Sequence, residues 1–322
     1  METAGGAFQS FTTLAERQPG RYGDQPFLTW YDDARDQRVE LSFKTFDNWV
    51  AKVANLLVDE LGAGPGDRVA AVLVDHWQTA VVLAACWRAG AGVVAVDPDA
   101  GGAALAAALG GVAAAFVREE RVAEAAGVLA AVPARPALVA LTADLGGRSV
   151  HDLGAALNFT RVVPAMGDLF AGAADPQGEA LRLAPGTTPA GGAATMAELL
   201  GEAARLAGGT GLHDGDRLLS GLPLLTPTGA ATGLLAPFGS GAGVVLASAF
   251  QPARFWKRVA DERVTVAALS PAQAESVLAA GPPPEDLDRS RLRAVACPAA
   301  HVAETLRTGF RDRLGVPMLP DD

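Results

Sequence analysis

The feature that most constrains the fold is a strand–helix–strand pattern that begins near residue 68. The run from Arg68 to Val74 has the length and apolar content of a buried strand, 77–89 is typical of a helix closed by Gly90, and 92–96 is a second strand. Two strands joined in this way by a helix form a βαβ unit. Such strands are parallel, because the crossover returns the chain to the same end of the sheet.

The same alternation returns in the second half of the chain. It predicts strands at 217–220, 243–247, 264–269 and 292–296, and helices at 252–262, 271–278 and 300–314. Repeated alternation of this kind predicts an α/β fold with mostly parallel sheets covered by helices. We expect two α/β subdomains, residues 1–170 and residues 171–322.

The region before residue 68 and the middle of the chain give fewer signals. Apolar residues recur at helical spacing from Phe43 to Leu61, with Ser42 placed as an N-cap and Gly62 after the last turn, so a helix is predicted there. Residues 103–109 predict a short helix and 137–142 a strand. Residues 158–177 have no clear period and are expected to be loop and short strand.

Charge and cysteine content exclude several classes of function. The formal net charge is −10 and the pI about 4.9, which argues against a nucleic-acid partner because phosphate binding needs a basic surface. The two cysteines, Cys86 and Cys297, have no metal-ligand spacing and indicate neither a zinc site nor a disulfide framework. Histidines far apart in the sequence give no metal site either. A protein of the reducing cytoplasm is expected.

One uncharged stretch is long enough to cross a bilayer. It runs from Leu218 to Ala253, but Pro223, Pro227 and Pro237 interrupt it and six glycines loosen it. Two buried strands around a short helix explain it better than a membrane span. We therefore expect no membrane association, and the first ten residues carry no signal-peptide pattern.

Short motifs in both halves resemble the adenylate-forming superfamily, which contains acyl-CoA synthetases and peptide-synthetase adenylation domains. The similar segments follow the order of the family, and each is weak alone. They are Pro65-Gly66-Asp67-Arg68-Val69-Ala70, Asp97-Pro98, Leu222-Pro223-Leu224, Phe250-Gln251-Pro252 and Glu262-Arg263-Val264-Thr265. The phrases at 31–42, 48–57 and 76–83 are similar to a shortened actinobacterial group of AMP-binding-enzyme relatives, whose role is not established.

This resemblance implies the fold of the family's N-terminal domain and suggests where a nucleotide would lie. The phosphate loop would correspond to 184–192, in which Gly186, Thr187 and Thr188 keep a Gly-Thr-Thr core. The adenine-side turn would correspond to 297–302, with Ala299 and Ala300 at its centre. These five residues are the candidate, vestigial nucleotide-binding site. ATP or AMP with magnesium would be the ligands if the family's activity survived; otherwise no cofactor is required.

The same segments depart from what adenylation chemistry needs. The phosphate loop contains Pro189, which lacks an amide donor, and no lysine follows it. The only lysines are Lys44, Lys52 and Lys257, none placed where the resemblance puts a catalytic lysine, and arginine does not replace a compact ammonium. The chain ends where the family's magnesium-binding glutamate would follow, and we expect no small C-terminal domain.

Other substitutions point the same way. Proline and alanine replace glycines of the adenine-side turn, and Thr226 stands where the family has a histidine. His301 is interpreted as a cap or surface residue, and Cys297 as a small buried residue, not a nucleophile. No residue is assigned a catalytic or metal-binding role.

Three functional hypotheses follow. The first is a degenerate, AMP-dependent synthetase-like protein, or pseudoenzyme, that keeps the fold and a nucleotide or acyl pocket. The second is an acyl- or aryl-adenylating ligase, dependent on ATP, that a second polypeptide completes. The third is a non-catalytic interaction or scaffold protein. Fold likeness alone does not choose among them, and no protein partner is identified by the sequence.

Overall fold

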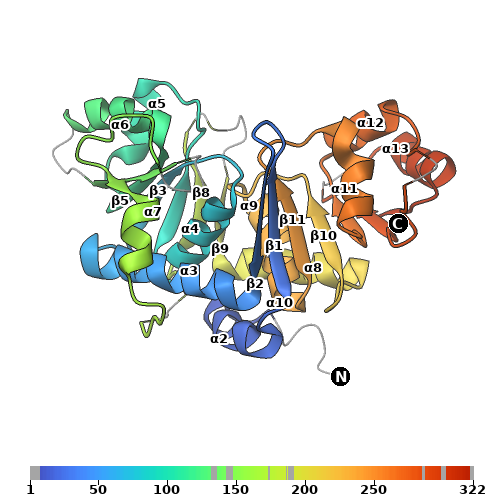
Figure 1. Ribbon diagram of the computed structural model, residues 1–322, viewed down its shortest axis with the longest axis horizontal. Coiled ribbons are helices and arrows are strands. Elements are labelled where there is room, and N and C mark those ends of the chain that lie inside the picture. Colours follow the sequence, from blue (N-terminus) through green and yellow to red (C-terminus); the bar gives the residue numbers. More distant parts are fainter. Residues whose placement is uncertain are drawn as a thin grey trace.

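The computed structural model describes residues 8–131, 136–142, 148–172, 175–185, 187, 192–284, 287–298 and 302–319. Within these residues the chain forms two seven-stranded sheets that lie side by side, with helices packed on both (Figure 1). Each sheet is parallel except at one antiparallel pair. The α/β fold class with mostly parallel, helix-covered sheets is therefore confirmed.

The first sheet, here sheet B, is built from the middle of the chain. Its strand order is β7-β6-β5-β3-β4-β8-β9, and only β8 and β9 run antiparallel. The predicted parallel βαβ unit is present, with β3 paired to β4 from Arg68↔Gly92 onwards. The strands are β3 (Arg68–Val72), β4 (Gly92–Ala95), β5 (Ala114–Arg118), β6 (Ala137–Leu141), β7 (Leu157–Asn158), β8 (Glu179–Leu183) and β9 (Ala193–Thr195).

Alternation along β3 explains why both faces of sheet B are covered. Val69 and Ala71 pack in one cluster with α3 (Phe43–Asn55) and α4 (Trp77–Arg88), while Ala70 and Val72 pack with α5 (Gly102–Leu109) and α6 (Val122–Leu129). Every residue of α4 is buried, so this helix lies in the centre of the molecule. Short helical turns complete this half: 3-10 turns at Glu119–Arg121 and Val163–Ala165, and α7 (Phe159–Val162).

The second sheet, sheet A, combines the start of the chain with its second half. The order is β14-β13-β12-β10-β11-β1-β2, and β1 pairs in parallel with β11 but antiparallel with β2. The β1–β2 hairpin rises at the top of Figure 1. The strands are β1 (Pro26–Asp32), β2 (Gln37–Ser42), β10 (Arg217–Ser220), β11 (Gly243–Ala247), β12 (Val266–Ala268), β13 (Ala294–Ala296) and β14 (Met318–Leu319).

Helices cover sheet A on two faces. One group packs in the main core with sheet B, and the other forms a separate apolar cluster with the outer face of sheet A. The first group is α2 (Phe11–Tyr22), α8 (Met196–Thr210), α9 (Pro227–Ala230), a π-helix at Ala231–Leu235 and α10 (Ala236–Ser240). The second is α11 (Phe255–Asp261), α12 (Pro271–Ala279), α13 (Glu304–Gly309) and a π-helix at Phe310–Leu314, and a 3-10 turn at Pro252–Arg254 with no buried residue precedes α11.

Most predicted elements are present, with shifted ends. The helix predicted at 43–61 is α3 continued by a π-helix at Leu56–Glu60, and Ser42 Oγ accepts from Thr45 N at 3.1 Å as the expected cap. The helix predicted from residue 300 begins at Glu304, because Ala303 is extended. Residues 158–177 contain α7 in addition to loop and strand.

Sheet membership crosses residue 170 in both directions. Strands β8 and β9 follow that residue but belong to sheet B, and β1 and β2 precede it but belong to sheet A. As a boundary between folding units, the division at residue 170 stays a prediction.

Candidate functional site

The candidate nucleotide site is described at only one of its five positions. Gly186, Thr188, Ala299 and Ala300 lie outside the described residues, and so does His301. Thr187 is described, and it lies just past the carboxyl end of β8, beside the end of β4.

The polar groups of Thr187 are engaged with the neighbouring backbone. Its Oγ1 accepts from Asp97 N at 3.3 Å and donates to Ala95 O at 3.5 Å. Its own N–H donates to Ala184 O at 3.1 Å. These bonds connect the residues that follow two neighbouring parallel strands. In this arrangement Thr187 holds the two strand ends together instead of presenting a free hydroxyl and amide to a phosphate.

The surroundings of Thr187 carry an acid. Asp97, whose backbone reaches Thr187, accepts Asp99 N on its Oδ1 at 2.8 Å and so forms a small turn after β4. The charged side chain next to this backbone contact is therefore an acid, which contributes no attraction for a phosphate group.

All three lysines lie on helices, and two of them make side-chain contacts of their own. Lys52 on α3 donates from Nζ to the carbonyls of Pro164 at 3.0 Å and Met166 at 2.6 Å. Lys257 on α11 pairs with Asp261 at 2.8 Å, and Lys44 is exposed on the first turn of α3. The loop between β8 and β9, where a phosphate-binding lysine would lie, contains no lysine.

The two second-half residues singled out in the sequence also have structural contacts. Cys297, after β13, is fully buried, and burial raises the pKa of its thiol, which disfavours the thiolate needed for a nucleophile. Thr226 caps α9: its Oγ1 accepts from Gly229 N at 3.0 Å and donates to Pro223 O at 2.8 Å. The interpretation of Cys297 as a buried residue is confirmed.

Sequence reasoning missed a polar junction where the two sheets meet. Asp75, in the loop after β3, accepts Leu224 N on its Oδ1 at 2.8 Å, and its carbonyl accepts Trp30 Nε1 at 3.1 Å. One residue thus ties β1, the β3–α4 loop and the segment before α9 together. The only sequence signal is a polar Asp-His pair directly after an apolar strand.

Desolvation shifts the pKa values of two neighbouring residues at this junction, Asp75 and His76. Desolvation raises the pKa of Asp75 to about 7, partly offset by the bond from Leu224 N. Burial lowers the pKa of the neighbouring His76 to about 3, so its ring is neutral. His76 Nδ1 accepts from Gln78 N at 3.1 Å and caps α4, and its ring packs edge-on against Trp30 with centroids 4.1 Å apart.

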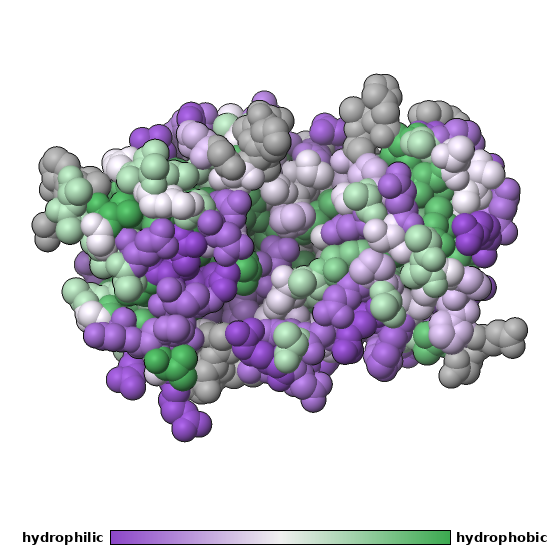
Figure 2. Space-filling model, turned by 90° about the horizontal axis from the view of Figure 1, so that it is seen from above, coloured by the Kyte–Doolittle hydropathy of each residue, from purple (hydrophilic) through white to green (hydrophobic). Residues whose placement is uncertain are grey.

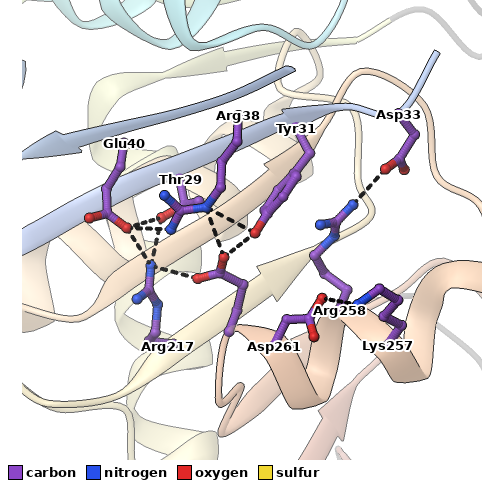
Figure 3. Close-up of polar contacts among 10 residues, drawn as sticks. Thr29, Tyr31, Asp33, Arg38, Glu40, Arg217, Lys257, Arg258 and Asp261 are labelled. Carbon is purple, nitrogen blue, oxygen red and sulfur yellow. Dashed lines mark hydrogen bonds and ion pairs between the residues drawn. The ribbon is translucent and has the colours of Figure 1, made fainter. Parts of the chain in front are cut away.

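A second polar cluster includes Tyr31, Arg38 and Arg217 (Figure 3). Its central carboxylate belongs to Glu262, which is 5% exposed. Its carboxylate contacts Arg38 Nε at 3.2 Å, Arg217 Nη2 at 3.1 Å and the Tyr31 hydroxyl. Arg258 lies 3.3 Å from the centre of the Tyr31 ring. The Glu262 carboxylate is therefore satisfied by two guanidinium groups and a phenol. This cluster fastens the β1–β2 hairpin to β10 and α11, and it leaves no reactive group free.

The described residues contain neither a candidate membrane span nor a candidate metal cluster. No helix in this part of the chain is both long and apolar enough to cross a membrane. Among the same residues, no three His, Cys, Asp or Glu side chains converge as a metal site.

Comparison with known proteins agrees with this architecture. A family model described as "AMP-binding enzyme" matches residues 15–168 and 186–320. A protein of Mycobacterium tuberculosis, named only for its sequence family, is 35% identical over 241 residues, which cover 74% of this chain and 90% of the relative.

Solved structures match over nearly the whole chain. An acyl-CoA synthetase of Brucella canis matches with a TM-score of 0.77 and 22% identity over 95% of this chain. A benzoate CoA ligase of Burkholderia xenovorans matches with a TM-score of 0.76 and 19% identity over 96%. This chain spans 56% and 60% of their respective lengths. At such identities the likeness shows the fold alone.

Proposed function

The chain belongs to the AMP-binding enzyme family, and we propose that it keeps the family's fold without its adenylation chemistry. In this proposal the protein is a pseudoenzyme of the cytoplasm that binds nucleotide weakly at most. The two cysteines support the compartment, because both are buried and unbridged, as expected in a reducing environment.

The observation that carries the proposal is the bonding of Thr187. A phosphate loop works because its amide and hydroxyl groups point at the ligand and are satisfied by it. Here the hydroxyl and amide of the described loop residue contact Asp97, Ala95 and Ala184. Binding a phosphate through Thr187 would first break these bonds, so binding energy would be lost to the rearrangement.

Charge supports the same conclusion. Acyl adenylation builds negative charge on phosphate oxygens, and enzymes stabilise it with cations placed beforehand. The three lysines lie on α3 and α11, two of them engaged in contacts of their own. The charged residue whose backbone bonds to Thr187 is an acid, Asp97, instead of a cation. ATP and AMP remain the first ligands to test because they define the family.

Replacing Thr187 by valine tests the structural role of its hydroxyl. We expect Thr187→Val to lower the free energy of unfolding by about 1 kcal/mol, the usual net loss when such bonds are removed. Thr187→Ser is the matched control, since it keeps the hydroxyl and should stay close to the parent. Urea unfolding measures both.

The same variants test binding. With ATP and Mg²⁺ in large excess, we expect the parent, Thr187→Val and Thr187→Ser proteins to show thermal shifts below about 1 °C. A clear ATP-dependent shift in the parent that Thr187→Val abolishes and Thr187→Ser retains would show that Thr187 contacts phosphate, and the proposal would be wrong.

A further inference from the structure

A cavity of about 220 Å³ lies between the carboxyl ends of the two sheets. Its floor comes from the ends of β3, β5 and β6 and the first turn of α4, and its wall from Arg35 in the β1–β2 hairpin and Ser248 after β11. Seen from above, the molecule is hollowed between its two halves (Figure 2). The cavity is separate from Thr187, which lies beyond β4 at the end of β8.

The topology of sheet B makes this a favoured place for a ligand. The chain leaves β3 through α4 towards β4 on one side, and leaves β5 through α6 towards β6 on the other. The connections diverge between the neighbouring strands β3 and β5. In open α/β sheets, a crevice forms outside the carboxyl ends of strands at such a switch point, and ligands commonly bind there. The cavity occupies that position.

His76 and Gln78 line the cavity, and each carries a buried polar atom with no hydrogen-bond partner among the described residues. The two atoms are His76 Nε2 and Gln78 Oε1, and Gln78 is only 2% exposed. Because His76 Nδ1 accepts from Gln78 N, the ring proton is on Nε2, which is therefore a donor. A buried donor and a buried acceptor two residues apart are costly unless something pairs with both.

The charges around the cavity cancel. Arg35 pairs with Asp32 at 2.7 Å, and Arg118 pairs with Glu120. His76 is neutral. The remaining lining includes the apolar side chains of Leu73 and Leu141. Such a site discriminates against a net charge, since an ion would lose its hydration without gaining an unpaired counter-charge.

We propose that this cavity binds a small neutral ligand with an apolar body and an amide- or hydroxyl-type head. Once a small movement of these two side chains turns them towards the cavity, the head accepts from His76 Nε2–H and donates to Gln78 Oε1, and the body contacts Leu73 and Leu141. An amide suits the site best, because it carries both a donor and an acceptor and so pairs with Gln78 in either orientation of that side-chain amide. The volume is sufficient, since cavities of about 150 Å³ admit benzene. This inference does not depend on adenylation.

Benzamide is the probe that tests the proposal. Titrated into the intact chain and followed by ¹H–¹⁵N NMR, it should give saturable shifts at the start of α4 and the ends of β3 and β5. A dissociation constant of about 1 mM is expected for a ligand of this size. Benzoate, which has the same shape but a negative charge, should bind at least about tenfold more weakly.

Gln78→Leu isolates the specific contact. The substitution leaves the backbone bond to His76 intact and removes the side-chain amide with its unpaired oxygen, so benzamide should bind at least about tenfold more weakly. Gln177→Leu, at an exposed glutamine, is the matched control and should bind as the parent does. If Gln78→Leu unfolds more easily than the parent, Gln78→Met provides the same test with a more adaptable side chain.

Three results would overturn the proposal. Absence of saturable shifts up to about 20 mM benzamide, a concentration well above the expected dissociation constant, would mean that the cavity holds water only. Benzoate binding as tightly as benzamide would mean an anion site. Unchanged benzamide affinity in Gln78→Leu would mean that the unpaired amide plays no part.

Discussion

Replacing Asp75 by asparagine is expected to stabilise the protein above pH 7, by roughly 2–4 kcal/mol in the free energy of unfolding. Loss of contact with water at the junction of the two sheets raises the pKa of this carboxyl group from 3.8 to about 7. Above that pH the folded protein carries a buried carboxylate with one backbone donor, Leu224 N. Asparagine keeps the acceptor for Leu224 N and removes the charge.

The pH dependence of this gain has a defined sign. Because the pKa of Asp75 is higher in the folded protein than in the unfolded chain, its contribution to stability is complete below about pH 4 and is lost as the pH rises through 7. The difference between Asp75→Asn and the parent should therefore be near zero at pH 4 and largest at pH 8.

His76 acts in the opposite direction over the same range. Its pKa falls from 6.5 to about 3 on folding, so its contribution is complete above pH 6.5 and is lost as the pH falls towards 3. In the parent, the pH-dependent contributions of Asp75 and His76 to the free energy of unfolding have opposite signs, so they largely cancel between pH 4 and 7. In Asp75→Asn only His76 remains, and the variant should lose stability on acidification.

Urea unfolding at a series of pH values, followed by tryptophan fluorescence, measures these differences. Asp59→Asn, at an exposed aspartate of the π-helix after α3, is the matched control and should follow the parent at every pH. An Asp75→Asn variant that is less stable than the parent at pH 8 would show that the carboxylate is required at the junction, contrary to this account.

Replacing Gly229 by alanine should cost at least about 3 kcal/mol, the range expected when a side chain is forced into filled space. A Cβ at this position would lie 1.8 Å from Pro223 O and 2.8 Å from Thr226 Oγ1. The clash is with backbone, which has no free rotamer to yield. It would also displace the segment that brings Leu224 N to Asp75.

Gly208→Ala is the matched control for the helix effect of the same substitution. Gly208 is exposed on α8, and a Cβ there meets nothing within 4 Å. Alanine should therefore stabilise by about 0.5–1 kcal/mol, because it fixes helical backbone more readily than glycine. If Gly229→Ala were within about 1 kcal/mol of the parent by urea unfolding, which is about fivefold in the unfolding equilibrium, the packing described for α9 would be wrong.

Local sequence patterns predicted the helices and strands in which buried positions form a continuous run or recur at regular spacing along the chain. The runs at 68–74 and 92–96 are apolar because both faces of β3 and β4 are covered, and that signal is present in the sequence itself. Helix α8 was missed because Gly201, Gly208 and Gly209 obscure its period. Its capping box, Thr195 with Glu198, is a sequence signal that would have located its start.

Contacts distant in sequence could not be predicted in this way. The pairing of β1 with β11 joins Leu28 to Val244, and no local pattern encodes that choice. The contacts of the candidate nucleotide site could not be predicted from local sequence either. The Gly-Thr-Thr core suggested phosphate contact, but the hydrogen bonds of Thr187 depend on the pairing of β4 with β8, which are distant in sequence. The roles of Asp75 and Gln78 depend on three-dimensional burial, which a loop sequence does not reveal.

Pyrophosphate exchange tests the central claim most directly. The purified chain is incubated with ATP, Mg²⁺, labelled pyrophosphate and a panel of fatty and aromatic acids, and label entering ATP is measured. The account predicts exchange at the level of the protein-free blank with every acid, because the cations that stabilise charge on the phosphates are missing from the loop after β8. Exchange above the blank that depends on both the acid and the chain would contradict it.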